Sequence, residues 1–227
     1  ETTFVGHPLA NTIPLQSNMN KYRKVLKLNR EELVIALLPG SRMGELKAHT
    51  DTLLETAQNL FEVYPDAKFL IPATNDKNVN FIKGRIRNNP TKNIKLSKGK
   101  VDEILSSANI AIAASGTASL QIALHKKPMI IIYKGSWVSY FIWKMVRLIP
   151  YVGLPNILLN ENFVPEMLQH RATPNLLSEK ACEMIKDKKY LQKIESKFKK
   201  LHKDLKRDTS VSYTHLRAHE TDSYLVC

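Results

Sequence analysis

Two short turns rich in glycine and hydroxyl side chains carry the residues best suited to chemistry in this chain. The first is Gly40-Ser41-Arg42, after an apolar run at 34–38, and the second is Ser115-Gly116-Thr117, after an apolar run at 109–114. A turn between a strand and a helix presents free backbone N–H groups and the positive end of the helix dipole. Gly40 permits close backbone approach, and the guanidinium of Arg42 matches phosphate oxygens. Two such turns in one domain predict a diphosphate pocket.

The residues next to the turns fit the same interpretation. Glu45 falls in the first turn of the following helix, where a carboxylate suits the dipole. Ser115 or Thr117 is expected to cap the second helix while its N–H groups face the ligand. Gln121, one helical turn further, is within reach of a sugar hydroxyl. The alternative interpretation is that these residues bind no ligand and form ordinary strand-to-helix turns with a cap, a surface arginine and an exposed glutamine.

Two further side chains are expected at the same edge of the sheet. Tyr133 ends the fourth strong apolar run and either stacks on a base or closes the core. Asn156 follows a turn near this rim, where it is a sugar or phosphate ligand or a turn-forming residue. The histidines have no metal-ligand spacing, and no carboxylate pair suggests a metal, so the sequence implies no metal and no cofactor.

The elements that must position these residues alternate along the chain. Apolar runs predict buried strands at 34–38, 68–73, 109–114 and 128–133, with a weaker strand at 93–97. Helical patterns lie between them, and the clearest are at 46–61, 101–108, 117–125 and, with many basic residues, 177–207. Strands that are apolar throughout and separated by helices indicate an α/β fold with a doubly wound, Rossmann-like parallel sheet. Such sheets bind ligands at the carboxyl ends of their strands, where both turns fall.

Composition narrows the partners. The chain has 227 residues and a formal charge of +13, which favours phosphorylated ligands or an anionic membrane surface. No nucleic-acid-binding module is recognisable, and a solvated lysine-rich surface explains the charge equally well. No apolar run is long enough to span a membrane. The segment 137–149 holds both tryptophans with Lys144 and Arg147, which suits either a membrane-interface helix or a core helix.

The chain divides into three parts. Residues 1–30 look irregular and are taken as an interdomain linker, and residues 31–209 as the Rossmann-like domain that holds the diphosphate pocket. Residues 210–227 change character, resemble a translated sequencing adapter and are taken as a non-native tail. The chain opens with Glu1, so an N-terminal part is expected to be missing.

Several motifs in this order resemble the lipid-A-disaccharide synthase family, glycosyltransferases of the GT-B type. They are Phe4-Val5-Gly6-His7-Pro8, Leu37-Leu38-Pro39-Gly40-Ser41-Arg42 with Glu45, Ala114-Ser115-Gly116-Thr117-Ala118, Pro128-Met129 through Tyr133-Lys134, Tyr151-Val152-Gly153-Leu154-Pro155-Asn156, and Pro165-Glu166 with Leu168-Gln169. The resemblance covers residues 4–209.

The resemblance implies the UDP-holding, C-terminal half of an enzyme that transfers diacylglucosamine from UDP to diacylglucosamine 1-phosphate. It places the protein in the bacterial cytoplasm, on the inner face of the inner membrane, and leaves a homo-oligomer open. The implied catalytic residues are Arg42, which neutralises the diphosphate, and Asn156, near the reacting centre. The implied UDP-sugar ligands are Gly40, Ser41, Arg42, Ser115, Gly116, Thr117, Gln121, Tyr133 and Asn156.

One departure and two alternatives accompany this interpretation. The family usually has Glu where this chain has Gln121, and an amide offers one acceptor and one donor group where a carboxylate offers two acceptors. The alternatives are another GT-B enzyme acting on a UDP-sugar, whose acceptor choice lies in the missing half, and a module that only binds UDP.

Overall fold

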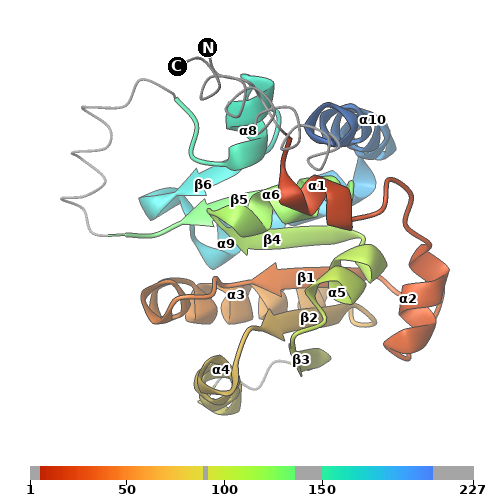
Figure 1. Cartoon of the computed structure of the whole chain (residues 1–227). Coiled ribbons are helices and arrows are strands. Elements are labelled where there is room, and N and C mark those ends of the chain that lie inside the picture. Colours follow the sequence, from red (N-terminus) through yellow and green to blue (C-terminus); the bar gives the residue numbers. More distant parts are fainter. Residues whose placement is uncertain (1–5, 89–91, 136–149, 207–227) are drawn as a thin grey trace, which may run out of the picture.

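A parallel sheet of six strands forms the centre of the molecule in a computed structural model that describes residues 6–88, 92–135 and 150–206 (Figure 1). The strands are β1 (Val34–Leu38), β2 (Lys68–Ala73), β3 (Ile94–Lys98), β4 (Ile110–Ala114), β5 (Met129–Tyr133) and β6 (Glu166–Leu168). Their order across the sheet is β3-β2-β1-β4-β5-β6, and every neighbouring pair is parallel. The five predicted strands are thus confirmed to within a residue.

The central strands are apolar on both sides because helices cover both faces of the sheet. Alternate residues of β1 enter two separate cores, with Val34, Ala36 and Leu38 in one and Ile35 and Leu37 in the other. This alternation follows from the two-residue period of a strand. Both sets of side chains are buried because each face of the sheet is covered by helices. All five residues of β1 and of β4 are buried.

The helices divide between the two faces. One core takes in α3 (Met43–Val63), α4 (Asp76–Asn88) and α9 (Pro174–Lys186), and the other takes in α1 (Pro8–Thr12), α5 (Val101–Ser107), α6 (Thr117–Leu124) and α10 (Lys188–Leu205). The short α8 (Leu154–Leu159) packs beside α6. In Figure 1, α1, α5 and α6 lie in front of the strands, and α3 and α9 lie behind them. The doubly wound, Rossmann-like α/β fold is therefore confirmed.

The expectation of an irregular segment at 1–30 is wrong for its described part. This part contains α1 and α2 (Met19–Val25). Arg23 of α2 is 2% exposed and donates hydrogen bonds to the carbonyls of Ser107, Asn29 and Arg30 and to Asn109 Oδ1. Arg23 thus fixes α2 to the amino end of the sheet, while only scattered apolar residues of this segment, Ala10, Ile13 and Leu26, enter the core. This apolar pattern is too sparse to predict the two helices.

Three other elements differ from the prediction. The basic helix expected at 177–207 is two helices, since Asp187 caps α10 by accepting a hydrogen bond from the Tyr190 amide. The first long helix begins at Met43 rather than at residue 46. The strand β6 was not predicted, because three residues carry too little pattern. The segments 137–149 and 210–227 lie outside the described residues, and no described helix is long and apolar enough to cross a membrane.

The strand order sets the place of the functional site. The sheet runs outward from β1 in one direction and from β4 in the other, so the connections after these two adjacent strands leave toward opposite faces. A crevice opens between such connections at the carboxyl edge, and it is where open α/β sheets bind ligands. Both glycine turns lie there.

Candidate functional site

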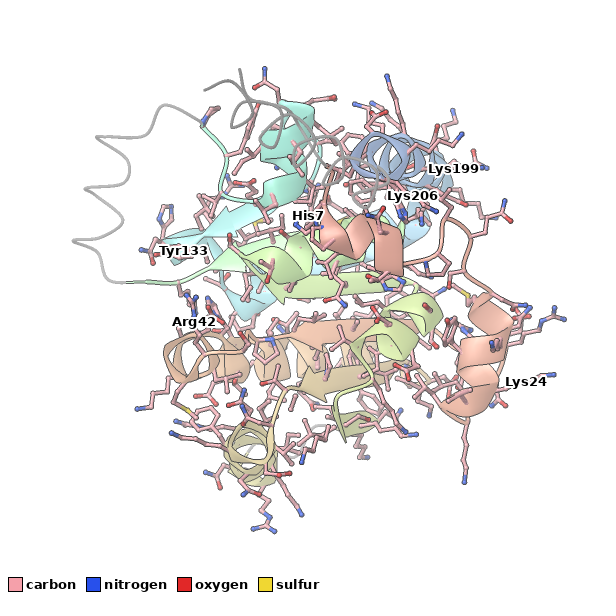
Figure 2. The ribbon with its side chains drawn as sticks, in the orientation of Figure 1. His7, Lys24, Arg42, Tyr133, Lys199 and Lys206 are labelled. Carbon is pink, nitrogen blue, oxygen red and sulfur yellow. The ribbon has the colours of Figure 1, made fainter. Side chains whose placement is uncertain are left out.

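One cavity of about 500 Å³ joins the two glycine turns at the carboxyl edge of the sheet. It brings together seven of the nine predicted site residues, namely Gly40, Ser41, Arg42, Ser115, Gly116, Thr117 and Gln121. Figure 2 shows Arg42 and Tyr133 at this same end of the sheet, with Lys24 and Lys199 at the other side of the molecule. The volume falls in the range of small-molecule sites in proteins.

The first turn is held by a carboxylate. Glu45 Oε2 accepts hydrogen bonds from the backbone N–H groups of Ser41 (2.8 Å) and Arg42 (3.1 Å). Gly40 has φ +113°, and a Cβ there would lie 2.4 Å from Glu45 Oε2. The expectation that these amides are free to face a ligand is therefore wrong, because the glycine makes room for Glu45 and Glu45 occupies both amides.

The side chain of Arg42 remains available for a ligand. It is exposed, lines the cavity and forms no ion pair with any residue in the described part of the chain. The turn that carries it is supported from α4, where the buried Asn78 donates hydrogen bonds to the Ser41 carbonyl (2.8 Å) and to Thr74 Oγ1 (2.7 Å). Sequence reasoning missed Asn78, although its spacing from Asn75, which caps its amide, is a helix-start signal.

The second turn offers free backbone donors. Gly116, with φ +147°, is the N-cap of α6, and no side chain caps the helix, so the expected cap by Ser115 or Thr117 is wrong. Ser115 Oγ donates instead to the Val152 carbonyl at 3.0 Å. Within the described ranges, no group accepts a hydrogen bond from the Thr117 or Ala118 amide. These two N–H groups, at the positive end of the α6 dipole, are the anion-binding donors of the cavity.

Gln121 is oriented by a carboxylate on the neighbouring helix α5. Its Nε2 donates to Asp102 Oδ1 at 2.8 Å, and the same oxygen lies 2.9 Å from His125 Nε2. Burial lowers the pKa of His125, and the Asp102 carboxylate opposes that shift. The donor group of Gln121 is thus engaged, and its carbonyl oxygen is left as an acceptor beside the cavity.

Tyr133 lies in a second cavity, of about 440 Å³, that adjoins the first. The two cavities share Glu45 and Ser115 as lining residues. Tyr133 is half-buried and packs so closely on the backbone of Gly135 that a Cβ there would lie 2.6 Å from the phenol oxygen. The structure therefore places Tyr133 next to the glycine turns and outside the cavity that holds Arg42.

Asn156 is placed away from both cavities. Its side chain is fully buried and donates to the Val164 carbonyl and to Glu166 Oε1, each at 2.8 Å. Its oxygen accepts from the amides of Phe163 (3.0 Å) and Val164 (2.8 Å). An amide with all these partners has no group left for a ligand, so the expected direct contact with substrate is wrong for this arrangement.

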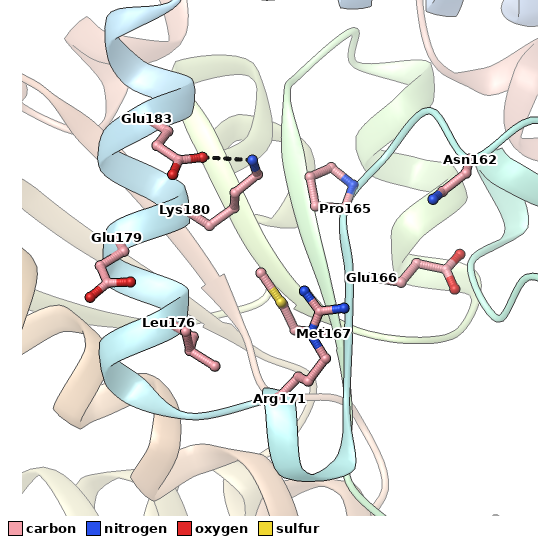
Figure 3. A pocket seen from close by; sticks show the side chains of 9 residues that line it. All are labelled: Asn162, Pro165, Glu166, Met167, Arg171, Leu176, Glu179, Lys180 and Glu183. Carbon is pink, nitrogen blue, oxygen red and sulfur yellow. Dashed lines mark hydrogen bonds and ion pairs between the residues drawn. The ribbon is translucent and has the colours of Figure 1, made fainter.

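A separate concavity of about 390 Å³ lies between β6 and α9, at the far edge of the sheet (Figure 3). Its charged residues are of both signs, and Lys180 is paired with Glu183 at 2.6 Å. Figure 3 shows Arg171 reaching up from the end of β6 toward Met167. This concavity is lined by no glycine turn, and it contains none of the predicted site residues.

Comparison with known proteins identifies one family of similar enzymes. The family model for lipid-A-disaccharide synthetase matches residues 1–219. A lipid-A-disaccharide synthase from Dechloromonas aromatica is 40% identical over 212 residues, which are 92% of this chain and 55% of the relative. The enzyme from Methylobacillus flagellatus is 37% identical over 209 residues, 91% of this chain and 55% of the relative. The chain thus spans about half the length of these relatives.

Solved structures support the fold. WaaG, a glycosyltransferase involved in lipopolysaccharide biosynthesis, aligns over 87% of this chain and 50% of its own with a TM-score of 0.59 and 11% identity. Anabaena HepE, solved with UDP and glucose, aligns over 91% of this chain and 52% of its own with a TM-score of 0.56 and 14% identity. At such low identity, the likeness concerns the fold alone.

Proposed function

The chain belongs to the lipid-A-disaccharide synthase family, and we propose that it is the half of that enzyme that holds the UDP-sugar donor. The proposed reaction transfers 2,3-diacylglucosamine from UDP to 2,3-diacylglucosamine 1-phosphate. Its products are lipid A disaccharide 1-phosphate and UDP. In a GT-B enzyme this half is the C-terminal domain, and the other half holds the acceptor.

One observation carries the proposal. A single cavity at the switch point of the sheet combines the exposed guanidinium of Arg42 with the amides of Thr117 and Ala118, which have no acceptor among the described residues. A nucleoside diphosphate needs this combination, because its two phosphates bind a cation and N–H donors together. In the transfer, the bond between the anomeric carbon of the sugar and the β-phosphate oxygen breaks. A bond forms between that carbon and a hydroxyl oxygen of the acceptor, whose proton passes to the catalytic base of the other half. The negative charge that develops on the leaving diphosphate is then stabilised by donors already in place.

The remaining residues of the proposed site either contact the nucleotide or hold the second glycine turn in position. The free carbonyl oxygen of Gln121 accepts a hydrogen bond from a ribose hydroxyl. Tyr133 lines the adjoining cavity, where the uracil ring of UDP binds against it. Asn156 acts at a distance through a chain of hydrogen bonds. It contacts Glu166, Glu166 Oε2 accepts from the Val152 amide, and the Val152 carbonyl accepts from Ser115 at the second turn. In this proposal Asn156 positions the turn and does not touch the reacting atoms.

The acceptor and the catalytic base belong to the half of the family's length that this chain does not span. We therefore expect the isolated chain to bind UDP without forming disaccharide. The net charge of +13 favours contact with an anionic membrane surface, as acylated substrates require, on the cytoplasmic face of the inner membrane.

Calorimetric titration with UDP and ADP tests the proposal. We expect the chain to prefer UDP, and Arg42→Ala to weaken binding about 10-fold or more, as the loss of a charged hydrogen bond implies. Arg171→Ala is the matched control, because Arg171 is also an exposed arginine at a cavity but lies between β6 and α9. Absent binding, or equal binding of both nucleotides unaffected by Arg42→Ala, contradicts the proposal. Binding of UDP by a complete enzyme that forms no disaccharide favours a binding-only module.

A further inference from the structure

His49 joins two segments at the carboxyl edge of the sheet, and the proposed function leaves it without a role. It lies on α3, one turn beyond Glu45, and is 3% exposed. Its Nδ1 lies 3.2 Å from the Pro39 carbonyl oxygen, at the start of the first turn. Its Nε2 accepts a hydrogen bond of 3.0 Å from the Lys134 amide, directly after β5.

The two partners fix the protonation state of the ring. A carbonyl oxygen only accepts, so Nδ1 carries a proton, and a backbone N–H only donates, so Nε2 is bare. The neutral Nδ1–H tautomer is the one form that satisfies both contacts. Burial lowers the pKa of His49, and of the charged groups facing it, Glu45 raises the pKa while Lys134 lowers it. The low pKa agrees with a ring that is held neutral.

The joined segments carry the two cavity walls that a nucleotide must bridge. Pro39 leads into the turn of Arg42, and Lys134 follows Tyr133. Their strands, β1 and β5, flank β4, so the link passes beside Ser115 at the end of β4. The segment that follows β5 is also held at Gly135, because Gln169 exchanges two hydrogen bonds of 3.2 Å with the Gly135 backbone. His49 therefore couples this segment to the first turn, while Lys134 Nζ also ties the segment to α3 by donating to Thr52 Oγ1 at 2.7 Å.

We infer that His49 is a positioning residue for nucleotide binding, which sets the spacing between the Arg42 turn and the Tyr133 segment through its Nδ1–H tautomer. The inference rests on the proposed function, because it presumes that a UDP-sugar bridges the two cavities. His49 itself lines the second cavity, together with Glu45 and Ser115, which both cavities share.

Three substitutions separate the two contacts of the ring. His49→Leu removes both, His49→Gln keeps an acceptor at the distance of Nε2, and His49→Asn keeps a donor at the distance of Nδ1. The matched control is His202→Leu, because His202 is fully buried and bonded to the Ala10 carbonyl at 2.9 Å, on the helix α10. Each variant is titrated with UDP-N-acetylglucosamine, and its thermal unfolding is recorded.

We expect His49→Leu to weaken binding about 10-fold or more, because it removes both buried hydrogen bonds of the ring. His49→Gln should restore most of the affinity, and His202→Leu should lower the melting temperature with affinity unchanged. A His49→Leu chain that binds as the wild type does, while Arg42→Ala does not, overturns the inference and leaves the proposed function intact. If the wild-type chain does not bind UDP-N-acetylglucosamine, both the inference and the proposed function are overturned.

A second measurement needs no ligand. The ring nitrogen shifts of His49 in the NMR spectrum of the wild-type chain report which nitrogen is protonated. A protonated Nδ1 with a bare Nε2 supports the inference. A protonated Nε2 overturns it, because that tautomer cannot accept from the Lys134 amide.

Discussion

Substitution of Gly40 by alanine should destabilise the chain by two separable effects. The first is backbone strain, because φ of +113° is a conformation that an L side chain rarely adopts, at a cost of about 1–3 kcal/mol. The second is displacement of Glu45, since the new Cβ would lie 2.4 Å from Glu45 Oε2 and 2.5 Å from Glu45 Cβ. The carboxylate would leave the amides of Ser41 and Arg42. Because this pair of hydrogen bonds is partly exposed, their loss costs about 1–2 kcal/mol more.

Gly116→Ala is the matched control. Gly116 also has a positive φ, +147°, but a Cβ there meets nothing within 4 Å. It should therefore show the strain alone, about 1–3 kcal/mol. Urea unfolding of both variants at neutral pH gives the two free energies.

A double-mutant cycle isolates the displacement. Glu45→Gly removes the atoms that the new Cβ would strike, so Gly40→Ala should cost about 1–2 kcal/mol less in that background than in the wild type. An equal cost in the two backgrounds would refute the reasoning, because the glycine would then be required for backbone conformation only.

Three further predictions concern other parts of the molecule. Asn156→Ala should lower the free energy of unfolding by about 3–4 kcal/mol, because it leaves several buried groups unpaired. Asn162→Ala, at an exposed position, should change this free energy by under about 0.5 kcal/mol, and similar losses for the two variants in urea unfolding would contradict the prediction. Burial lowers the pKa of Lys127 to about 8, so folding carries the cost of a buried charge, which is complete below pH 8 and fades as the pH rises toward 10.5. Lys127→Met should accordingly raise the free energy of unfolding at pH 7 by up to about 3 kcal/mol, and an advantage that does not shrink above pH 8 would refute the assignment. The chain should co-sediment with vesicles that contain phosphatidylglycerol at low salt and be released at about 0.5 M salt, because the proposed contact is electrostatic; binding that survives salt would point to insertion instead.

The sequence predicts the sheet well because burial on both faces leaves an unmistakable pattern. The runs at 34–38 and 68–73 coincide with β1 and β2, and the turns that follow β1 and β4 meet at one cavity, as parallel topology requires. The short helices α1 and α2 were missed because they have only five and seven residues and few apolar residues that enter the core, while polar contacts of Arg23 hold α2 to the domain.

The sequence predicts the residues of the site better than their roles. Glycine next to a hydroxyl residue looks the same in both turns, yet Glu45 occupies the Ser41 and Arg42 amides of the first turn. At the second turn, the Thr117 and Ala118 amides have no acceptor among the described residues. Only the folded arrangement shows which side chain reaches which amide. The contacts of His49 and Asn156 join segments 85 and 10 residues away, so no local pattern could reveal them.

The structure of the chain with UDP bound is the most direct test of the central claim. The account predicts the diphosphate in the cavity between the two glycine turns, within hydrogen-bond distance of the Thr117 and Ala118 amides and of the Arg42 guanidinium. A diphosphate held by the amides of Ser41 and Arg42 after Glu45 has moved away, or UDP bound between β6 and α9, would contradict it.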